Sequence, residues 1–160
     1  MRDQIFGEIN HEDGGWHGEY PLDFGGTVCS VEILIHSEDE IAESQRDAFR
    51  CFIEKWPDLN EKLIEALIGY YNNEERFSYG PDSEEEMSAW WPEIETKEAL
   101  LQAVKLETIV VAEDFMMEDG RYIYLLFSRL WGGEDLDDNG IGVCFVDEKI
   151  TEIGYKDIAF

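Results

Sequence analysis

The sequence predicts an α+β protein in which two or three helices pack on one face of an antiparallel sheet. Segments with the alternating apolar pattern of β-strands occupy the first and the last third of the chain. The middle third instead carries the i, i+3, i+4 apolar spacing of amphipathic helices. Strands and helices that are segregated in this way are typical of an α+β fold. A chain of 160 residues suits one domain, which we expect to span residues 1–160.

The first third is predicted to form an antiparallel meander. A short alternating segment lies at 5–9, and apolar residues at every second position from Trp16 to Phe24 indicate one face of a longer strand. Pro21 favours an edge position in that strand, because proline donates no hydrogen bond to a neighbour. The β-branched segment 27–35 predicts the next strand.

The middle third is predicted to be helical. The spacing Ser37–Glu40 is that of a capping box, and the helix that follows is expected to end at Pro57. A second helix is predicted within 58–71, and two helices joined this tightly are expected to pack antiparallel against the sheet. Thr96 is expected to cap a short third helix over 97–106.

The last third is predicted to return to β-structure and to complete the sheet. The segment 122–131 is apolar at nearly every position, which indicates a central strand that is covered on both faces. Shorter strands are predicted at 108–112, 141–146 and 150–153.

Charge is the most extreme property of the sequence. Twelve Lys and Arg stand against 38 Asp and Glu, which gives a formal net charge of −26. Nucleic acids and anionic membranes are bound through Lys and Arg, so this chain is expected to be repelled by both. The same field attracts cationic surfaces and accelerates association with them. The charge therefore predicts a basic protein partner, with solubility alone as the alternative explanation.

Cys29, Cys51 and Cys144 form an odd and widely spaced set, and each lies in an apolar stretch. This distribution is typical of buried thiols in a reducing compartment rather than of disulfides. No apolar run approaches the roughly 18 residues of a membrane span, and the first residues lack the apolar segment of a secretion signal. We therefore expect a cytoplasmic protein with no membrane partner.

A metal-binding hypothesis rests on Asp135, Asp137 and Asn139. Together with Gly140 they match the first, third, fifth and sixth positions of a calcium-binding loop. The last position of that loop requires a bidentate Glu, but Val146 occupies it, and the flanking segments are predicted strands rather than helices. Asp, Asn and Gly are also ordinary residues of a turn between strands. The alternatives are therefore a Ca²⁺ or Mg²⁺ site and a hairpin loop, of which the loop is favoured.

Motifs of catalysis are lacking in the sequence. It contains no nucleophile motif, no phosphate-binding glycine loop and no paired Cys/His spacing. We therefore expect no catalytic residue and no cofactor. The most interface-like segment combines acidic residues with tryptophans, because Trp is enriched in interface hot spots, although tryptophans that anchor a loop are the alternative. The predicted partner-binding residues are Asp82, Glu84, Glu85, Glu86, Trp90 and Trp91.

Three segments together carry a resemblance to a known family. They are Ile5–Glu8 followed by Trp16, the helical block 52–71, and the end of the chain over 140–160. The chain resembles a family of small bacterial cytosolic proteins that is classed as a domain of unknown function. Members are similar in setting to the immunity proteins of polymorphic-toxin and contact-dependent-inhibition systems. The resemblance implies an interaction protein more than an enzyme, and it transfers no catalytic residue.

These observations lead to one favoured function and two alternatives. We expect a non-enzymatic protein-binding protein of the immunity type, which neutralises a basic toxin such as a nuclease by complementing its cationic groove. The alternatives are a metal-binding module or enzyme that uses the loop Asp135–Asn139, and a structural domain whose acidity has no specific target.

Overall fold

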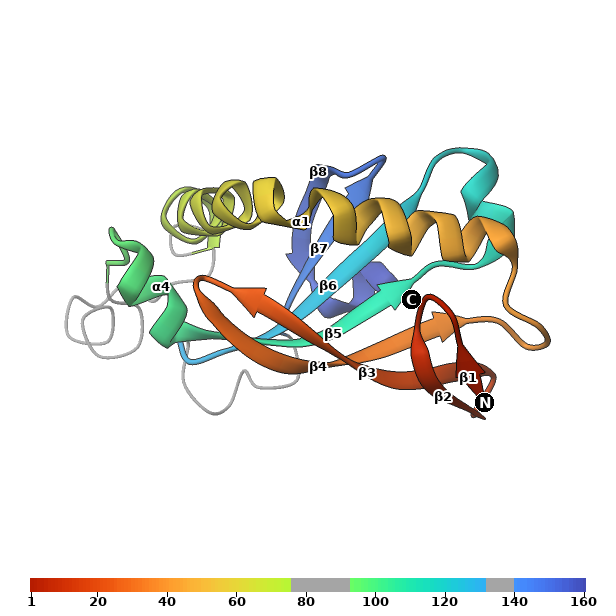
Figure 1. The fold of residues 1–160 in the computed structure, drawn as a ribbon. Helices are drawn as coiled ribbons and strands as arrows, with labels where there is room; N and C mark the ends of the chain where they lie inside the picture. The colour runs from red at the N-terminus through yellow and green to blue at the C-terminus, as the bar shows by residue number, and fades with distance from the viewer. Residues whose placement is uncertain (76–92, 132–139) are drawn as a thin grey trace.

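A computed structural model describes residues 1–75, 93–131 and 140–160 of the chain. In this part, eight strands form one sheet, and their spatial order follows their order in the sequence (Figure 1). The strands are β1 (Arg2–Asp3), β2 (Gly7–Glu12), β3 (Gly15–Phe24), β4 (Thr27–His36), β5 (Val104–Val111), β6 (Tyr122–Arg129), β7 (Ile141–Val146) and β8 (Lys149–Tyr155). Neighbouring strands are antiparallel except for β4 and β5, which are parallel.

In the described residues two helices pack against this sheet, so the predicted α+β class is confirmed. The long helix α1 (Glu43–Tyr70) lies across one face, and the short helix α4 (Lys97–Ala103) contributes Leu100 to the same core (Figure 1). Among the described residues, no helix is both long and apolar enough to span a membrane.

Pro57 does not end the first helix, so the prediction of two antiparallel helices was wrong. α1 runs through Pro57 as one helix of 28 residues. Proline removes a backbone hydrogen bond and normally disrupts a helix interior. The residues on both sides are anchored here: Trp56 and Leu59 are each 4% exposed, and the Trp56 indole donates to the Asp23 carbonyl at 2.6 Å. Burial of this apolar face outweighs the lost hydrogen bond.

α1 also begins later than the predicted capping box. Ser37 lies in the loop before the helix, and Ala42 occupies the N-cap position. The N–H of Ala42 donates to Oε1 of Gln45 at 3.0 Å. The amide nitrogen of Gln45 in turn donates to the carbonyls of His36 at 2.8 Å and Ala112 at 2.9 Å. The buried Gln45 therefore joins the start of α1 to the ends of β4 and β5.

Both faces of the sheet bury apolar residues. The face under α1 holds the main core, and the opposite face holds a smaller cluster beside the 3₁₀ segments η2 (Asp114–Glu118) and η4 (Lys156–Ala159). β6 contributes to both: Ile123, Leu125 and Phe127 enter the main core, whereas Tyr124 and Leu126 enter the smaller cluster. The prediction of a central strand covered on both faces is confirmed.

The predicted third helix is shorter than expected. Thr96 caps α4 as predicted, since its hydroxyl oxygen accepts the N–H of Ala99 at 3.2 Å. The helix ends at Ala103, because the following residues, including buried Leu106, join β5 and pair with β6. β3 lies between β2 and β4 and is not an edge strand as predicted from Pro21, but its second half, which includes Pro21, pairs with β4 alone because the pairing with β2 extends no farther than Gly18.

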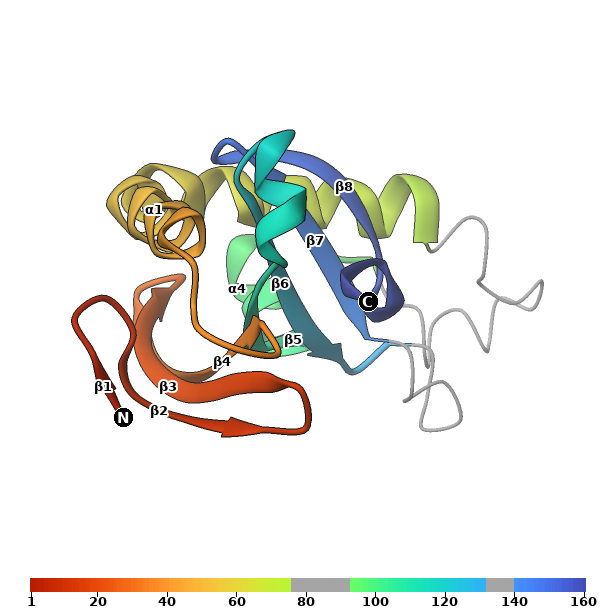
Figure 2. The ribbon, with the colours of Figure 1, turned by 90° about the vertical axis from the view of Figure 1, so that its right-hand side faces the viewer.

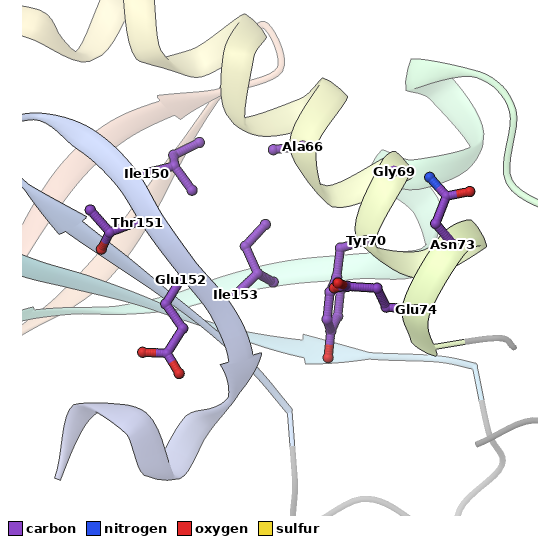
Figure 3. Close-up of a pocket in the computed structure, with 9 residues that line it drawn as sticks. All are labelled: Ala66, Gly69, Tyr70, Asn73, Glu74, Ile150, Thr151, Glu152 and Ile153. Atoms are coloured by element: carbon purple, nitrogen blue, oxygen red, sulfur yellow. The ribbon is translucent and has the colours of Figure 1, made fainter. Parts of the chain in front are cut away.

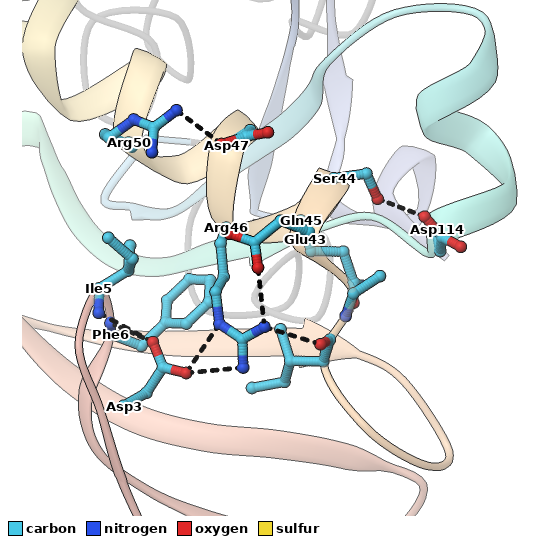
Figure 4. A network of polar contacts seen from close by, with 12 residues as sticks. Asp3, Ile5, Phe6, Glu43, Ser44, Gln45, Arg46, Asp47, Arg50 and Asp114 are labelled. Carbon is cyan, nitrogen blue, oxygen red and sulfur yellow. Dashed lines mark hydrogen bonds and ion pairs between the residues drawn. The ribbon is translucent and has the colours of Figure 1, made fainter.

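A polar network fastens the N-terminal edge of the sheet to α1 (Figure 4). The Asp3 carboxylate accepts the N–H groups of Ile5 at 2.8 Å and Phe6 at 3.1 Å. Arg46 donates to the same carboxylate through Nε and Nη2, both at 2.9 Å. Burial raises the pKa of Asp3, but the two backbone donors and Arg46 together outweigh burial and hold this pKa below its ordinary value.

Candidate functional site

The residues that were predicted to form a site lie outside the described part of the chain. The structure therefore places neither the predicted contact segment nor the predicted metal loop, and both stay predictions. The residues concerned are Asp82, Glu84, Glu85, Glu86, Trp90 and Trp91 for the partner, and Asp135, Asp137 and Asn139 for the metal. Among the residues that the structure does describe, no group of three His, Cys, Asp or Glu could hold a metal ion.

Exposed carboxylates gather at the end of the sheet where α1 begins. The β2–β3 turn, the loop between β4 and α1, the first turn of α1 and η2 meet there, and Figure 2 views the molecule from this end. Side chains hold these stretches together. The Trp16 indole donates to the Asp39 carbonyl at 2.9 Å, and the Ser44 hydroxyl donates to the Asp114 carboxylate. The carboxylates of these stretches are therefore held close to one another.

We call this region the acidic end. Its exposed carboxylates are Glu12, Asp13, Glu38, Asp39, Glu40, Glu43, Glu113, Asp114, Glu118 and Asp119. The segments 11–15, 36–45 and 112–120 contain no Lys or Arg. Of the arginines that follow in α1, Arg46 pairs with Asp3 and also with Glu43 of this end, whereas Arg50 pairs with Asp47. Because few Lys or Arg side chains neutralise these carboxylates, they create a local negative potential that attracts cations.

An apolar pocket of about 390 Å³ opens at the acidic end, between η2, η4 and the sheet. Met116, Tyr124 and Ile158 contribute to its walls. Phe115 and Phe160, which also line it, are 67% and 76% exposed. The described chain exposes few other large apolar side chains, and these are Met1, Val28 and Leu130. The two exposed phenylalanines thus line one pocket where the carboxylates gather, which is the arrangement expected of an interface.

Two polar rings, those of His36 and Tyr124, line the same pocket beside the carboxylate of Glu113. The His36 ring lies edge-on to the Phe160 ring with centroids 5.6 Å apart, and within the described structure its buried Nε2 has no hydrogen-bond partner. Tyr124, which lies in β6, provides the second ring of the pocket lining. Burial, and after it the nearby Cys144, raises the pKa of Tyr124 to about 12, so its phenol stays neutral near neutral pH. The pocket therefore combines an apolar lining with groups that can form hydrogen bonds to a partner.

The sequence contained a signal for this pocket that was missed. Phe115, Met116 and Met117 stand in a row between acidic residues on both sides, where neither a strand nor a helix pattern needs them. The apolar residues of such a segment either dock on the core or stay on the surface. Met117 docks on both clusters of the core, whereas Phe115 stays exposed.

Comparison with known proteins identifies the family. The profile of a domain of unknown function, DUF6985, matches residues 5–160. The chain belongs to the DUF6985 family. This confirms the predicted membership of a family of unknown function, whereas a bacterial origin and a relation to immunity proteins stay predictions. No curated protein and no solved structure matches the chain.

The acidic end lies within the residues that define this DUF6985 domain, since the match extends from before β2 to the end of η4. The chemistry of the domain's thiols also bears on its function. Burial is the main cause that raises the pKa values of Cys29 and Cys144 above their ordinary value. A thiol with a raised pKa forms little thiolate, so neither residue is activated as a nucleophile. In the described residues of this DUF6985 domain, the features that stand out are therefore charge and exposed apolar surface.

Proposed function

We propose that this DUF6985 protein binds a basic protein partner through its acidic end, as a cytoplasmic immunity protein of a bacterium that neutralises a nuclease toxin. The observation that carries the proposal is the apolar pocket with exposed Phe115 and Phe160, set among exposed carboxylates. Aromatic side chains that enter a partner's surface supply most of the binding energy of an interface. Charges around them set the rate of association and exclude partners of the same sign.

A nuclease is a suitable partner because its substrate is a polyanion. It must present Lys and Arg to bind phosphates, and an inhibitor with clustered carboxylates can occupy that surface. The acidic end meets this requirement, because its segments contain no Lys or Arg that would repel the cationic groove. Binding there would exclude nucleic acid from the nuclease by direct competition.

The test uses the purified product of the adjacent gene as partner, with binding measured at low and high salt. Phe115→Ala is expected to weaken binding by about 2 kcal/mol, or about thirtyfold, because it removes an aromatic anchor. Val28→Ala is the matched control: Val28 is also 67% exposed, but it lies near the β3–β4 turn at the opposite end of the sheet. This control is expected to leave binding unchanged.

The charge contribution is tested separately through the rate of association. Glu113→Gln is expected to slow association at low salt and to have less effect at high salt, because exposed charges are screened. The proposal is overturned if the adjacent gene product does not bind at either salt concentration. Equal weakening by the substitutions at Phe115 and Val28 would also overturn it, since the acidic end would then have no special role.

A further inference from the structure

A second candidate binding surface, an edge strand beside a groove, lies at the other end of α1. β8 pairs with β7 on one side, and no strand of the described chain pairs with its other side. A groove of about 360 Å³ separates this outer side from the last turns of α1 and from the π-helical segment η1 (Tyr71–Glu75) (Figure 3). The exposed N–H and C=O groups of an edge strand are a template for pairing with a further strand. We call this region the β8 groove.

Small residues on α1 keep the β8 groove open. Ala66 and Gly69 lie opposite Ile150 and Ile153, which point from β8 toward the helix (Figure 3). Among the described residues, a Cβ added at Gly69 would meet nothing closer than the Asn73 side chain at 3.9 Å. Packing against the described part of the chain therefore does not require glycine at this position, although glycine weakens a helix. Its missing side chain leaves room beside β8 for an incoming backbone.

Charge decides which polypeptide fits the groove. The charged side chains that line it are Glu74 and Glu152, and no Lys or Arg is among the described residues of its lining. A second copy of the chain would bring the same carboxylates together between molecules of net charge −26. A segment that alternates basic and apolar residues complements both the carboxylates and the two isoleucines.

We propose that the β8 groove binds an extended, basic segment of another protein, which adds to the sheet as a further strand beside β8. Backbone hydrogen bonds then provide affinity, and the side chains that alternate toward Ile150 and Ile153 provide specificity. The pairing of β7 with β8 shifts register between Cys144 and Phe145, so the edge is bulged rather than flat. A bulge discourages indiscriminate pairing, which favours a selective segment over general aggregation.

The experiment titrates the protein with a synthetic peptide that alternates lysine and valine, and follows backbone amide resonances by NMR. Saturable shifts are expected at β8 and at the last turns of α1. Gly69→Leu, which fills the groove from the helix, is expected to weaken binding by about tenfold or more. Gly69→Ala is the matched variant: it adds one methyl group to open space and is expected to bind nearly as well as the parent.

Two control peptides separate the contribution of charge from that of backbone hydrogen bonds. Replacing lysine by glutamate is expected to abolish binding, and so is placing proline at alternate positions, because proline has no N–H to donate. The inference is overturned if the shifts spread over the whole acidic surface, or if folded Gly69→Leu binds as tightly as the parent. Shifts at β8 that follow protein concentration without peptide would overturn it in favour of a second copy.

The inference goes beyond the proposed function because it concerns a different surface. The β8 groove lies at the end of α1, and the acidic end lies at its start. Phe115→Ala is therefore expected to leave peptide binding at the groove unchanged. Conversely, Gly69→Leu is expected to leave binding at the acidic end unchanged, so failure of one proposal is distinguishable from failure of the other.

Discussion

The two edges of the sheet differ in how their backbones are covered. β1, at the first edge, is two residues long, and Asp3 within it is fastened to α1 through Arg46 (Figure 4). β8, at the other edge, is seven residues long and borders a groove lined by Ile150 and Ile153 (Figure 3). A short edge that is fixed by a buried ion pair offers little backbone for pairing, whereas a longer edge beside a groove offers a site.

Gly18, near the first edge, and Gly69, beside the β8 groove, differ in the space around them. A Cβ added at Gly18 in β3 would lie 2.8 Å from the Glu8 carbonyl oxygen of β2 and 2.8 Å from a methyl carbon of Ile9. Of the residues that the structure describes, a Cβ added at Gly69 would meet only the Asn73 side chain, at 3.9 Å. Close packing near the first edge requires glycine, whereas open space at the β8 groove does not. The difference indicates that the first edge is built for stability and the second for access.

The largest effect is expected from breaking the network at the first edge. Asp3→Ala removes the partner of Arg46 and leaves the N–H groups of Ile5 and Phe6 without their acceptor. The Asp3 side chain is only 4% exposed, so the loss is that of a buried group, and we expect the free energy of unfolding to fall by about 3 kcal/mol. Urea unfolding measures the change. A value that stays the same would show that β1 contributes nothing to stability.

Acid provides an independent check on the same network. The pKa of Asp3 is lowered in the folded chain from an ordinary value of 3.8. A lowered folded pKa stabilises the folded state fully above the unfolded pKa, and this contribution is lost as pH falls through the folded pKa. The difference in stability between the parent and Asp3→Ala should therefore stay constant down to about pH 5 and narrow as the pH falls below 3.8. A difference that widened with acid would contradict the role of the ionised carboxylate.

A smaller loss is expected at Gly18. The added methyl group of Gly18→Ala meets the backbone of β2 rather than a flexible side chain, so β2 must move away from β3. Overpacking of this kind costs about 2 kcal/mol, which urea unfolding resolves. Backbone amide exchange should show faster opening in β2 than in β7, because the strain is local. Uniform loss of protection across the sheet would indicate a different cause.

Strands with a periodic apolar pattern could be predicted from the sequence. Features that depend on contacts between distant residues could not. The alternation from Trp16 to Phe24 and the two-faced apolar segment of β6 predicted their strands, because burial of a face leaves a local pattern. Pro57 misled the prediction, since its cost is local whereas the compensation comes from core packing and from the distant Asp23 carbonyl. The acidic end was likewise hidden, because its carboxylates come from separate segments that only the fold brings together. Charge composition predicts a basic partner, which stays a prediction, but it could not locate the surface.

The smallest change in stability is expected at Gly69, beside the β8 groove. Unlike the loss expected for Gly18→Ala, it is a gain. Gly69→Ala introduces a helix-favouring residue at a position where the methyl group meets no atom of the described chain closer than 3.9 Å. Its expected effect is a gain of about 0.5–1 kcal/mol in the free energy of unfolding, since glycine is that much less favourable than alanine within a helix. Urea unfolding of Gly69→Ala and Gly18→Ala compares the same added methyl group near the two edges of the sheet. A loss of stability at Gly69 would mean that the space beside β8 is already filled by the chain itself, and the β8 groove could then not receive a strand.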